Sequence, residues 1–420
     1  MLTWLTWLTL ATRNLLRNGR RSLFTIAAIG LGFLAVNVLG GFTAYIFTSL
    51  QDSYIYAEAN GHLTIFKSGF LDKGKLDPTR YLLNEAQLAS IRQVLARQPE
   101  VILGTPQLQL SGLLSNGQIS TIFVASGRVP SDVEAIARHA AGAGGQRLTL
   151  YDGKPLADNI SYGIGVSHGL AQQLSLQLGS TAVAMAPTVQ GQINALDAQL
   201  WQLIDAPIEA LEDKLATVPL AFAQKLYDTG SVDRVTVLLH STDQTQAMRA
   251  RLATALAAAG LQVDIRTWNE LSPFYTKVKK MFDVIFFISF LIVFTIVVMS
   301  VVNTLTMAVM ERTREIGTLR ALGVKRRGIV ALFSLESMLL SGCGSLLGAA
   351  LTLVVVHLIG VLQPTWIPPQ IARSVPLQIH LVPQYWVFSA ILLLLLSMLA
   401  AVMPARKAAR MAITNALGYA

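Results

Sequence analysis

Four long stretches of the chain are free of charged residues, or nearly so, and each is long enough for one membrane-spanning helix. They run from Ser22 to Gln51, from Val284 to Met310, from Gly328 to Ala372 and from Ser374 to Ala405. Only Glu336 interrupts the third, and its helix ends at the proline-rich piece 363–369. A helix needs roughly 20 apolar residues to cross a bilayer. The pattern therefore predicts four spans, at residues 23–50, 281–310, 328–360 and 385–404.

The segment between the first and second spans, residues 51–280, has the mixed pattern of a folded α+β domain. Strand composition marks Gly61–Phe66 and Asp233–His240. Helical periodicity marks Glu85–Arg97, Val166–Leu178 and Thr245–Ala259, and we interpret Ile193–Val218 as an inserted helical piece. We expect two subdomains. The predicted fold is a membrane α-helical protein with four transmembrane helices (1+3) and a large α+β extracytoplasmic domain inserted between the first and second.

Basic residues mark the side of the membrane on which each short segment lies. Residues 1–22, expected to form an interfacial N-terminal helix, hold four arginines and no acid. The loop 311–327 holds six basic and two acidic residues, and the tail 405–420 holds Arg406, Lys407 and Arg410. Such segments stay on the cytoplasmic side. Residues 51–280 and the short loop 361–384 should therefore lie outside the cytoplasm.

Composition then narrows the class of protein. The chain is 53% hydrophobic and 14% charged, against about 25% charged in soluble domains. Its net charge of +9 follows from the basic cytoplasmic segments, so we expect no nucleic-acid partner. One cysteine, Cys343, and six histidines without ligand spacing predict no metal and no cofactor in this chain. A weak nucleophile-elbow match around Ser167 leaves a membrane-anchored hydrolase as the enzyme alternative.

The loop from Glu311 to Gly323 reads ERTREIGTLRALG, which predicts a short amphipathic helix. On such a helix Arg312 would pair with Glu315, and Glu311 with Arg314, three residues apart. An apolar stripe would consist of Ile316, Leu319 and Gly323. This pattern suits docking into a groove of a soluble partner, whereas the alternative is an ordinary basic loop.

Two features of the third span concern helix packing. Gly344 and Gly348 form a small-xxx-small motif, which allows close approach either within the chain or between two copies. Glu336 would be costly facing lipid. A structural hydrogen bond to a neighbouring loop, or a proton or substrate site, would explain its presence.

The ERTREIGTLRALG loop resembles the cytoplasmic signature of the FtsX-like permeases of ABC transporters, which include MacB-type exporters and Lol-type lipoprotein-releasing permeases. Further segments resemble the family at the entry to the first span, in the third span, after the fourth span and just before the second span. They are residues 11–18, 336–348, 404–409 and 267–275. The resemblance covers the whole chain, although the outside domain matches mainly in layout.

The resemblance implies a permease subunit of the mechanotransmission type in the bacterial inner membrane. Its partners would be a second permease, identical or related, and a dimer of cytoplasmic ATPase subunits, which would hold ATP and magnesium. A periplasmic adaptor or a lipoprotein carrier is a further candidate partner. Residues 311–323 would be the coupling helix, whose expected ATPase-coupling residues are Glu311, Arg312, Arg314, Glu315, Ile316, Leu319, Arg320 and Gly323.

The expected substrate is a lipoprotein or another amphiphile that enters between the first and second spans. Candidate contacts are apolar residues at suitable depth, namely Leu31, Phe33, Val38, Phe42, Ile288, Ile292 and Ile296. Two alternatives remain open. One is a MacB-like tripartite efflux permease for peptides, toxins or drugs with an adaptor and an outer-membrane duct. The other is an FtsX-like signalling protein that activates a cell-wall hydrolase.

Overall fold

The computed structural model describes residues 4–17, 19–74, 76–142, 151–159, 162–206, 209–366 and 375–411. It divides into two units. The helical unit consists of Met1–Phe47, Val278–Pro364 and Pro376–Ala420, and the sheet unit consists of Thr48–Lys277 and Thr365–Val375. Each unit is described by itself below.

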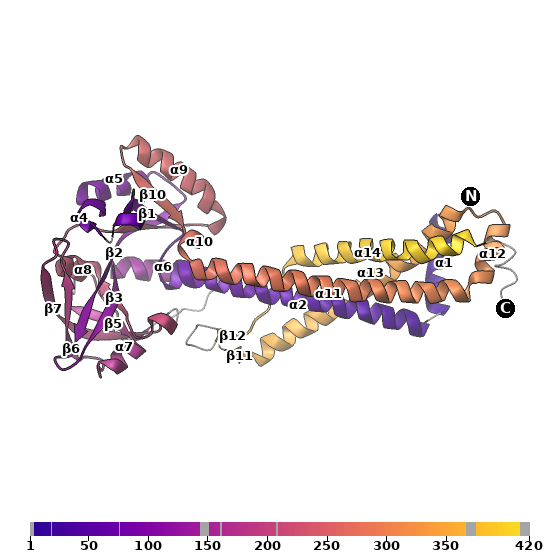
Figure 1. Ribbon diagram of the computed structural model, residues 1–420, viewed down its shortest axis with the longest axis horizontal. Helices are drawn as coiled ribbons and strands as arrows, with labels where there is room; N and C mark the ends of the chain where they lie inside the picture. Colours follow the sequence, from indigo (N-terminus) through magenta and orange to yellow (C-terminus); the bar gives the residue numbers. More distant parts are fainter. Residues whose placement is uncertain are drawn as a thin grey trace. The chain divides into compact units, whose positions relative to one another are not determined.

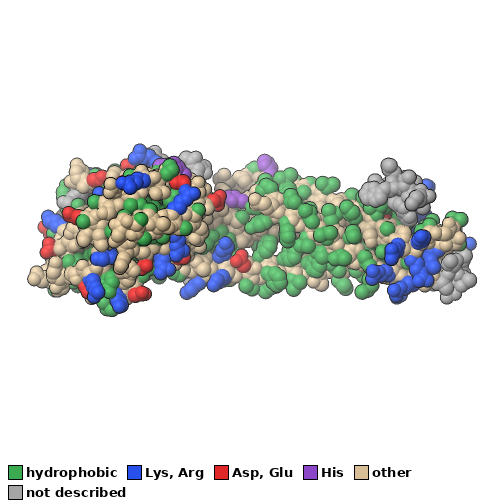
Figure 2. Space-filling model, turned by 90° about the horizontal axis from the view of Figure 1, so that it is seen from above, with side chains coloured by type: hydrophobic (Ala, Val, Ile, Leu, Met, Phe, Trp, Pro, Cys, Tyr) green, Lys and Arg blue, Asp and Glu red, His purple; other side chains and the backbone are tan. Residues whose placement is uncertain are grey.

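Among the described residues, six helices supply the helical unit (Figure 1). They are α1 (Trp4–Arg17), α2 (Gly19–Asp52), α11 (Pro273–Glu311), α12 (Thr313–Ala321), α13 (Arg326–Leu362) and α14 (Pro383–Arg410). Within the described residues, four helices are long and apolar enough to cross a membrane, at Gly19–Ala57, Pro273–Glu311, Arg326–Leu362 and Pro383–Arg410. Hydrophobic side chains cover their exposed surface, and Lys and Arg side chains gather at the end that carries α12 (Figure 2). We call this the α12 end.

Close contact between α2 and α13 depends on glycine. A Cβ atom added to Gly348 would lie 2.6 Å from the carbonyl oxygen of Gly30, and one added to Gly344 would lie 2.7 Å from Ile29. These distances are shorter than real Cβ atoms show, so a larger residue would force the two backbones apart. Of the two packing alternatives open from the sequence, the structure shows the contact within one chain.

The sheet unit is built on a mixed sheet, in which ten strands belong to the described residues. The strands are β1 (Leu63–Lys67), β2 (Val101–Ser115), β3 (Ser120–Arg128), β4 (Tyr151–Gly153), β5 (Gly163–Ser167), β6 (Thr181–Pro187), β7 (Ile193–Ile204), β8 (Leu215–Pro219), β9 (Arg234–Leu239) and β10 (Val263–Thr267). Their order is β10-β1-β9-β2-β3-β8-β5-β7-β4, and β6 pairs with both β2 and β7. The β3–β8 and β5–β7 pairs are parallel, and the other pairs are antiparallel. Strands β11 (Thr365–Trp366) and β12 (Val375–Pro376) form a separate small sheet.

Helices connect these strands and cover the sheet. They are α3 (Phe70–Lys73), α4 (Pro78–Tyr81), α5 (Glu85–Leu95), α6 (Pro130–Gly142), α7 (His168–Gln173), α8 (Leu220–Tyr227), α9 (Thr245–Ala258) and α10 (Trp268–Leu271), with a π-helix η1 (Ser53–Ala57) and 3-10 turns η2 (Glu209–Leu211) and η3 (Thr242–Gln244). Helix α5 begins where the sequence predicts a helix because Asn84 and Gln87 form a reciprocal capping box.

Two large hydrophobic clusters stabilise this one sheet. The first lies around β2, β3 and β5 to β8 and includes Leu108, Phe123 and Phe222. The second lies around β1, β9, α5 and α9 and includes Ile65 and Val235, which are paired in register. Strand β2 contributes to both, through Leu108, Leu110 and Leu114 in the first and partly buried Val101 in the second.

The sheet unit buries one neutral histidine. His62 is fully buried; its Nδ1 accepts a hydrogen bond from the Leu239 backbone N–H at 3.1 Å, and its Nε2 lies 3.1 Å from Thr242 Oγ1. Since Nδ1 is an acceptor, Nε2 carries the proton. Burial disfavours the charged ring and lowers the pKa of His62 to about 4.

The strands predicted at 61–66 and 233–240 are confirmed as β1 and β9, and the helices predicted at 85–97 and 245–259 as α5 and α9. The prediction of an inserted helical piece at 193–218 is wrong, because this segment forms β7 and the start of β8. Burial along β7 alternates at Ala198, Leu200 and Gln202, which is the period of a strand. In the predicted helix 166–178, Val166 and Ser167 belong to β5, and α7 contains only residues 168–173.

Candidate partner-docking site

The predicted coupling segment is a separate short helix. Helix α11 ends at Glu311, and Arg312 leaves the helical conformation, with φ −106° and ψ 18°. Helix α12 then runs over nine residues, and Gly323 ends the turn after it with φ +91°, a conformation that favours glycine. Backbone N–H groups of Gly323 and Val324 donate to the carbonyls of Arg320 and Leu319 and close the helix.

A buried ion pair fixes the break between α11 and α12. Arg312 Nη1 lies 3.0 Å from Glu336 Oε1 on α13, and the side chains are only 7% and 4% exposed. The second arm of the guanidinium donates to the Asn14 carbonyl of α1 at 3.0 Å, and Asn14 Nδ2 donates to the same Glu336 oxygen at 2.5 Å. Three segments therefore meet at one charged contact, which we call the Arg312–Glu336 clamp.

In the clamp, Glu336 is hydrogen-bonded to Arg312 in the loop between α11 and α12. This is a structural partner of the kind expected from the sequence for an acid within a span. The clamp also removes Arg312 from the predicted docking surface, because a side chain buried between helices cannot reach a separate protein. This is a correction to the expected contact set. The physical reason is that a charge pair at this depth needs both partners and their hydrogen bonds to offset desolvation.

The two ion pairs predicted within the coupling helix do not form. Glu315 pairs with Arg17 of α1 at 2.8 Å, and Glu311 pairs with Arg21 of α2. The three-residue spacing fails because the chain is not helical at Arg312, between Glu311 and Arg314. The Arg17 and Glu315 side chains are 67% and 47% exposed, so water screens this pair and it contributes little to stability.

The apolar stripe of α12 faces the bundle. Ile316 is buried in one hydrophobic cluster with Ile329 and Ala408, and Leu319 packs against it, so neither is presented to a partner as predicted. The exposed residues of the coupling segment 311–323 are Glu311, Arg314, Glu315, Thr318, Ala321, Leu322 and Gly323. Leu322 is 77% exposed and is the large apolar side chain on this face. The structure thus presents an apolar tip beside the charged residues Arg314 and Glu315.

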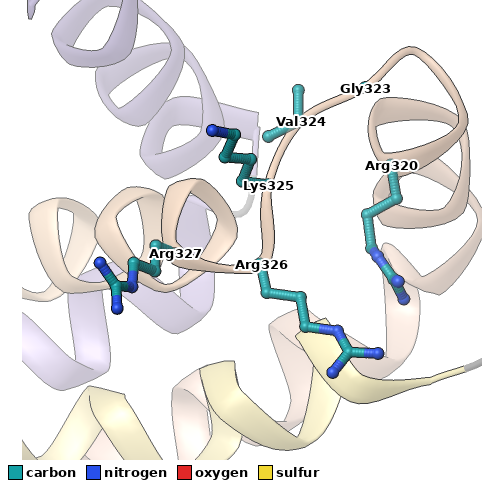
Figure 3. A pocket seen from close by; sticks show the side chains of 6 residues that line it. All are labelled: Arg320, Gly323, Val324, Lys325, Arg326 and Arg327. Atoms are coloured by element: carbon teal, nitrogen blue, oxygen red, sulfur yellow. The ribbon is translucent and has the colours of Figure 1, made fainter.

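The end of α12 borders a shallow basic cavity of about 560 Å³ that is open to solvent. Six residues line it, namely Arg320, Gly323, Val324, Lys325, Arg326 and Arg327 (Figure 3). Arg320 is half-buried and donates to the carbonyl of Met411 just after α14. Its predicted role as an exposed partner contact therefore fits the geometry less well than that of Arg314.

The predicted amphiphile contacts separate into exposed, partly buried and buried residues. Ile288, Ile292 and Ile296 are 50%, 55% and 57% exposed on α11, and Leu31 is 56% exposed on α2. Val38 and Phe42 are partly buried. Phe33 is 2% exposed and packs edge-to-face on Trp386 of α14, so it belongs to the bundle core and not to a substrate surface.

Ser167 has the environment of a structural residue. It is fully buried, and its hydroxyl donates to the carbonyl of Glu212 at 2.7 Å, with the Leu215 carbonyl at 3.2 Å. The neighbouring His168 is close to Asp205, at 3.8 Å, and points to no activated serine. A nucleophile must reach its substrate, so the burial of Ser167 does not fit the role that the hydrolase alternative gives it.

The sequence reasoning missed four residues of this site. Asn14, Arg17 and Arg21 contact the coupling segment, and Leu322 is its exposed apolar tip. Asn14 and Arg17 lie in the segment 11–18 that resembles the family entry to the first span, and Arg21 follows it closely. That resemblance could have indicated that these residues contact the loop 311–327, although not which residues of the loop they pair with.

Comparison with known proteins identifies the part of the chain that holds this site. Residues 286–413 match the family model of the FtsX-like permease C-terminal domain. The chain is 30% identical over 127 residues to the macrolide export ATP-binding/permease protein MacB of Salmonella paratyphi A, covering 30% of this chain and 19% of that protein. It is 47% identical over 51 residues to MacB of Bdellovibrio bacteriovorus, covering 12% of this chain and 8% of that protein.

The solved periplasmic region of MacB from Actinobacillus actinomycetemcomitans aligns with a TM-score of 0.36 at 16% identity, over 53% of this chain and 94% of that one. The sequence matches with the two MacB proteins described above cover about a fifth of the length of those proteins or less. The matched region 286–413 includes α12, the Arg312–Glu336 clamp and α14. Residues 286–413 thus match the FtsX-like permease family model, and this part of the chain is similar to MacB-type permeases.

Proposed function

We propose that this chain is the membrane subunit of an ABC transporter in a bacterial inner membrane. Two such subunits, identical or related, would work with two ATPase subunits that hold ATP and magnesium. Both termini and α12 would lie in the cytoplasm, and the sheet unit in the periplasm, as the distribution of basic residues indicates. The family match supports a permease role, and the MacB relatives are named as joint ATP-binding and permease proteins.

The observation that carries the proposal is the anchoring of α12. Its buried face and the Arg312–Glu336 clamp attach it to α1, α11 and α13, while Arg314 and Leu322 remain exposed. A soluble partner could hold the exposed face in a groove. Because the attachment is buried and bonded on several sides, a displacement of α12 would carry these helices with it.

Helices α2 and α11 provide the route to the sheet unit. Each contains residues of both units, since α2 continues to Asp52 and α11 begins at Pro273. Movement imposed at the α12 end would thus be passed along two continuous helices. This supports mechanotransmission, in which the periplasmic domain acts on substrate and the spans act as levers.

The substrate that we propose is a lipoprotein or another amphiphile taken from the outer leaflet. Ile288, Ile292 and Ile296 form an exposed apolar face on α11 that an acyl chain could contact. A MacB-like efflux permease for peptides, toxins or drugs, with an adaptor and duct, is the second candidate. The similarity of residues in the permease region to macrolide export proteins favours it. Signalling to a cell-wall hydrolase ranks lower, because the outside domain is large for that role.

Substitution of Leu322 tests the docking face. We expect Leu322→Asp to weaken association with the ATPase at least about ten-fold, because a leucine buried in a groove contributes roughly 1.5–3 kcal/mol. Leu76→Asp is the matched control, since Leu76 is 86% exposed in the sheet unit. The complex would be purified through a tag on this chain, and bound ATPase, its activity and co-purified lipoproteins measured. Wild-type ATPase binding and stimulation by Leu322→Asp would contradict the docking role.

A further inference from the structure

The basic cavity at the α12 end is not explained by the docking face. Four cationic side chains and no acidic one are among the residues that line it, and Gly323 and Val324 complete the wall. Figure 3 shows the guanidinium groups of Arg320 and Arg326 on one side of the loop, whereas Lys325 and Arg327 extend from its other side. The guanidinium groups of Arg320 from α12 and Arg326 from α13 thus border the same basic cavity.

Among the described residues, no acidic side chain pairs with the cations that line this cavity. The acidic side chains that the structure describes near this end are Glu311, Glu315 and Glu336, and each is bonded to another arginine. Those arginines are Arg21, Arg17 and Arg312. Like charges held together cost free energy unless an anion or solvent compensates them. The arrangement therefore favours an anionic ligand.

Arg320 is held in position for such a ligand. It comes from the last turn of α12, and its Nη1 donates to the Met411 carbonyl. Arg326 is the first residue of α13, and the positive φ of Gly323 turns the chain between them. A guanidinium presents paired N–H donors that match phosphate oxygens, so two of them suit one phosphate group.

The cavity lies near the level of lipid headgroups. Met403 of α14 is 77% exposed and Met310 of α11 is 58% exposed, which marks the end of the apolar surface. Arg410, beside the residue that Arg320 contacts, is seven positions beyond Met403, or about 10 Å along the helix. The headgroup layer extends roughly 5–8 Å beyond the hydrocarbon core, and long basic side chains reach back into it.

We propose that this cavity binds the phosphate of an anionic phospholipid headgroup from the leaflet at the α12 end. Basic pockets between spans are suited to such headgroups. An acidic surface of a protein partner is the competing occupant. The lipid is favoured because Arg410, next to the residue that Arg320 contacts, is only about 10 Å along α14 from the exposed Met403, while the exposed Leu322 tip offers the partner an apolar contact.

The test uses the purified full-length chain in detergent without any partner. Thermal unfolding is measured with dioctanoyl phosphatidylglycerol, dioctanoyl phosphatidylcholine or inorganic phosphate at equal concentrations. We expect phosphatidylglycerol alone to raise the Tm. Arg320→Gln with Arg326→Gln should weaken this binding at least ten-fold, whereas Arg320→Lys with Arg326→Lys, which keeps the charge, should retain part of it. The matched control is Arg406→Gln with Lys407→Gln, which removes the same charge from exposed positions outside the cavity.

Three results would overturn the proposal. Equal loss of phosphatidylglycerol binding in the control would show a general charge effect. Equal stabilisation by inorganic phosphate would show a soluble anion in place of a lipid. Unchanged phosphatidylglycerol binding in the double glutamine variant, with loss of ATPase association in the assembled complex, would assign the cavity to a protein partner.

Discussion

The Arg312–Glu336 clamp gives a prediction whose magnitude follows from its burial. With both side chains less than a tenth exposed, removal of one partner leaves an uncompensated charge, at a cost of about 3–5 kcal/mol. Glu336→Ala and Arg312→Ala should each destabilise the helical unit by this amount. For a unit of this size, the Tm falls by roughly 2–4 °C per kcal/mol, which gives at least about 6 °C.

Replacement of both charges should behave differently. Arg312→Met with Glu336→Leu removes the desolvation cost of both ions, so we expect a Tm within about 3 °C of the wild type. The double variant should nevertheless lose coupling, because the buried bonds from Arg312 to Asn14 of α1 and to Glu336 of α13 are lost and only the exposed Glu315–Arg17 pair and apolar packing still attach α12. Thermal unfolding in detergent would measure the first effect, and the ratio of substrate transport to ATP hydrolysis the second. Single variants with a Tm within 2 °C of the wild type would refute the buried clamp, and a fully coupled double variant would refute its role.

Two further predictions concern other parts of the chain. Gly348→Ala should lower the stability of the helical unit by about 1–3 kcal/mol because its Cβ would meet the Gly30 carbonyl. Gly342→Ala is the control and should be neutral or slightly stabilising, because its Cβ meets nothing within 4 Å. Equal Tm values of the two variants in detergent would contradict this packing. For His62, the unfolded pKa of 6.5 exceeds the folded value of about 4, so the unfolded state binds the extra proton as pH falls. The sheet unit should therefore keep this stability above pH 6.5 and lose about 2–3 kcal/mol by pH 4.5, as measured by urea unfolding with tryptophan fluorescence; a His62→Gln variant with the same pH dependence would exclude this histidine as the cause.

The four long helices could be predicted because their signal is local. An uncharged run of about 30 residues is sufficient for a span whatever it packs against. Strands β1 and β9 were also visible from composition, since both are central and rich in apolar residues. Strand β7 was missed because its inward positions include Ala198 and Gln202, which carry no strong hydrophobic signal.

The motif predicts where the candidate site lies on the chain, but the contacts of its residues could not be predicted from local sequence. The rule for residues three apart pairs Arg312 with Glu315, whereas the actual partner, Glu336, is 24 residues away. Likewise, the stripe of Ile316 and Leu319 is apolar whether it faces a partner or the bundle. Only the position of α13 and α14 shows that it faces the bundle and leaves Leu322 outside.

Strand β2 has a consequence for how this protein can change during evolution. Its 15 residues pair with β9 near one end and with β3 and β6 near the other, and they contribute to both large clusters. A single-residue deletion near the middle of the strand would exchange its inward and outward faces on one side of the deletion. Loops of the sheet unit can gain or lose residues independently, but the length of β2 is constrained by two cores at once. Insertions and deletions among relatives should therefore avoid this strand.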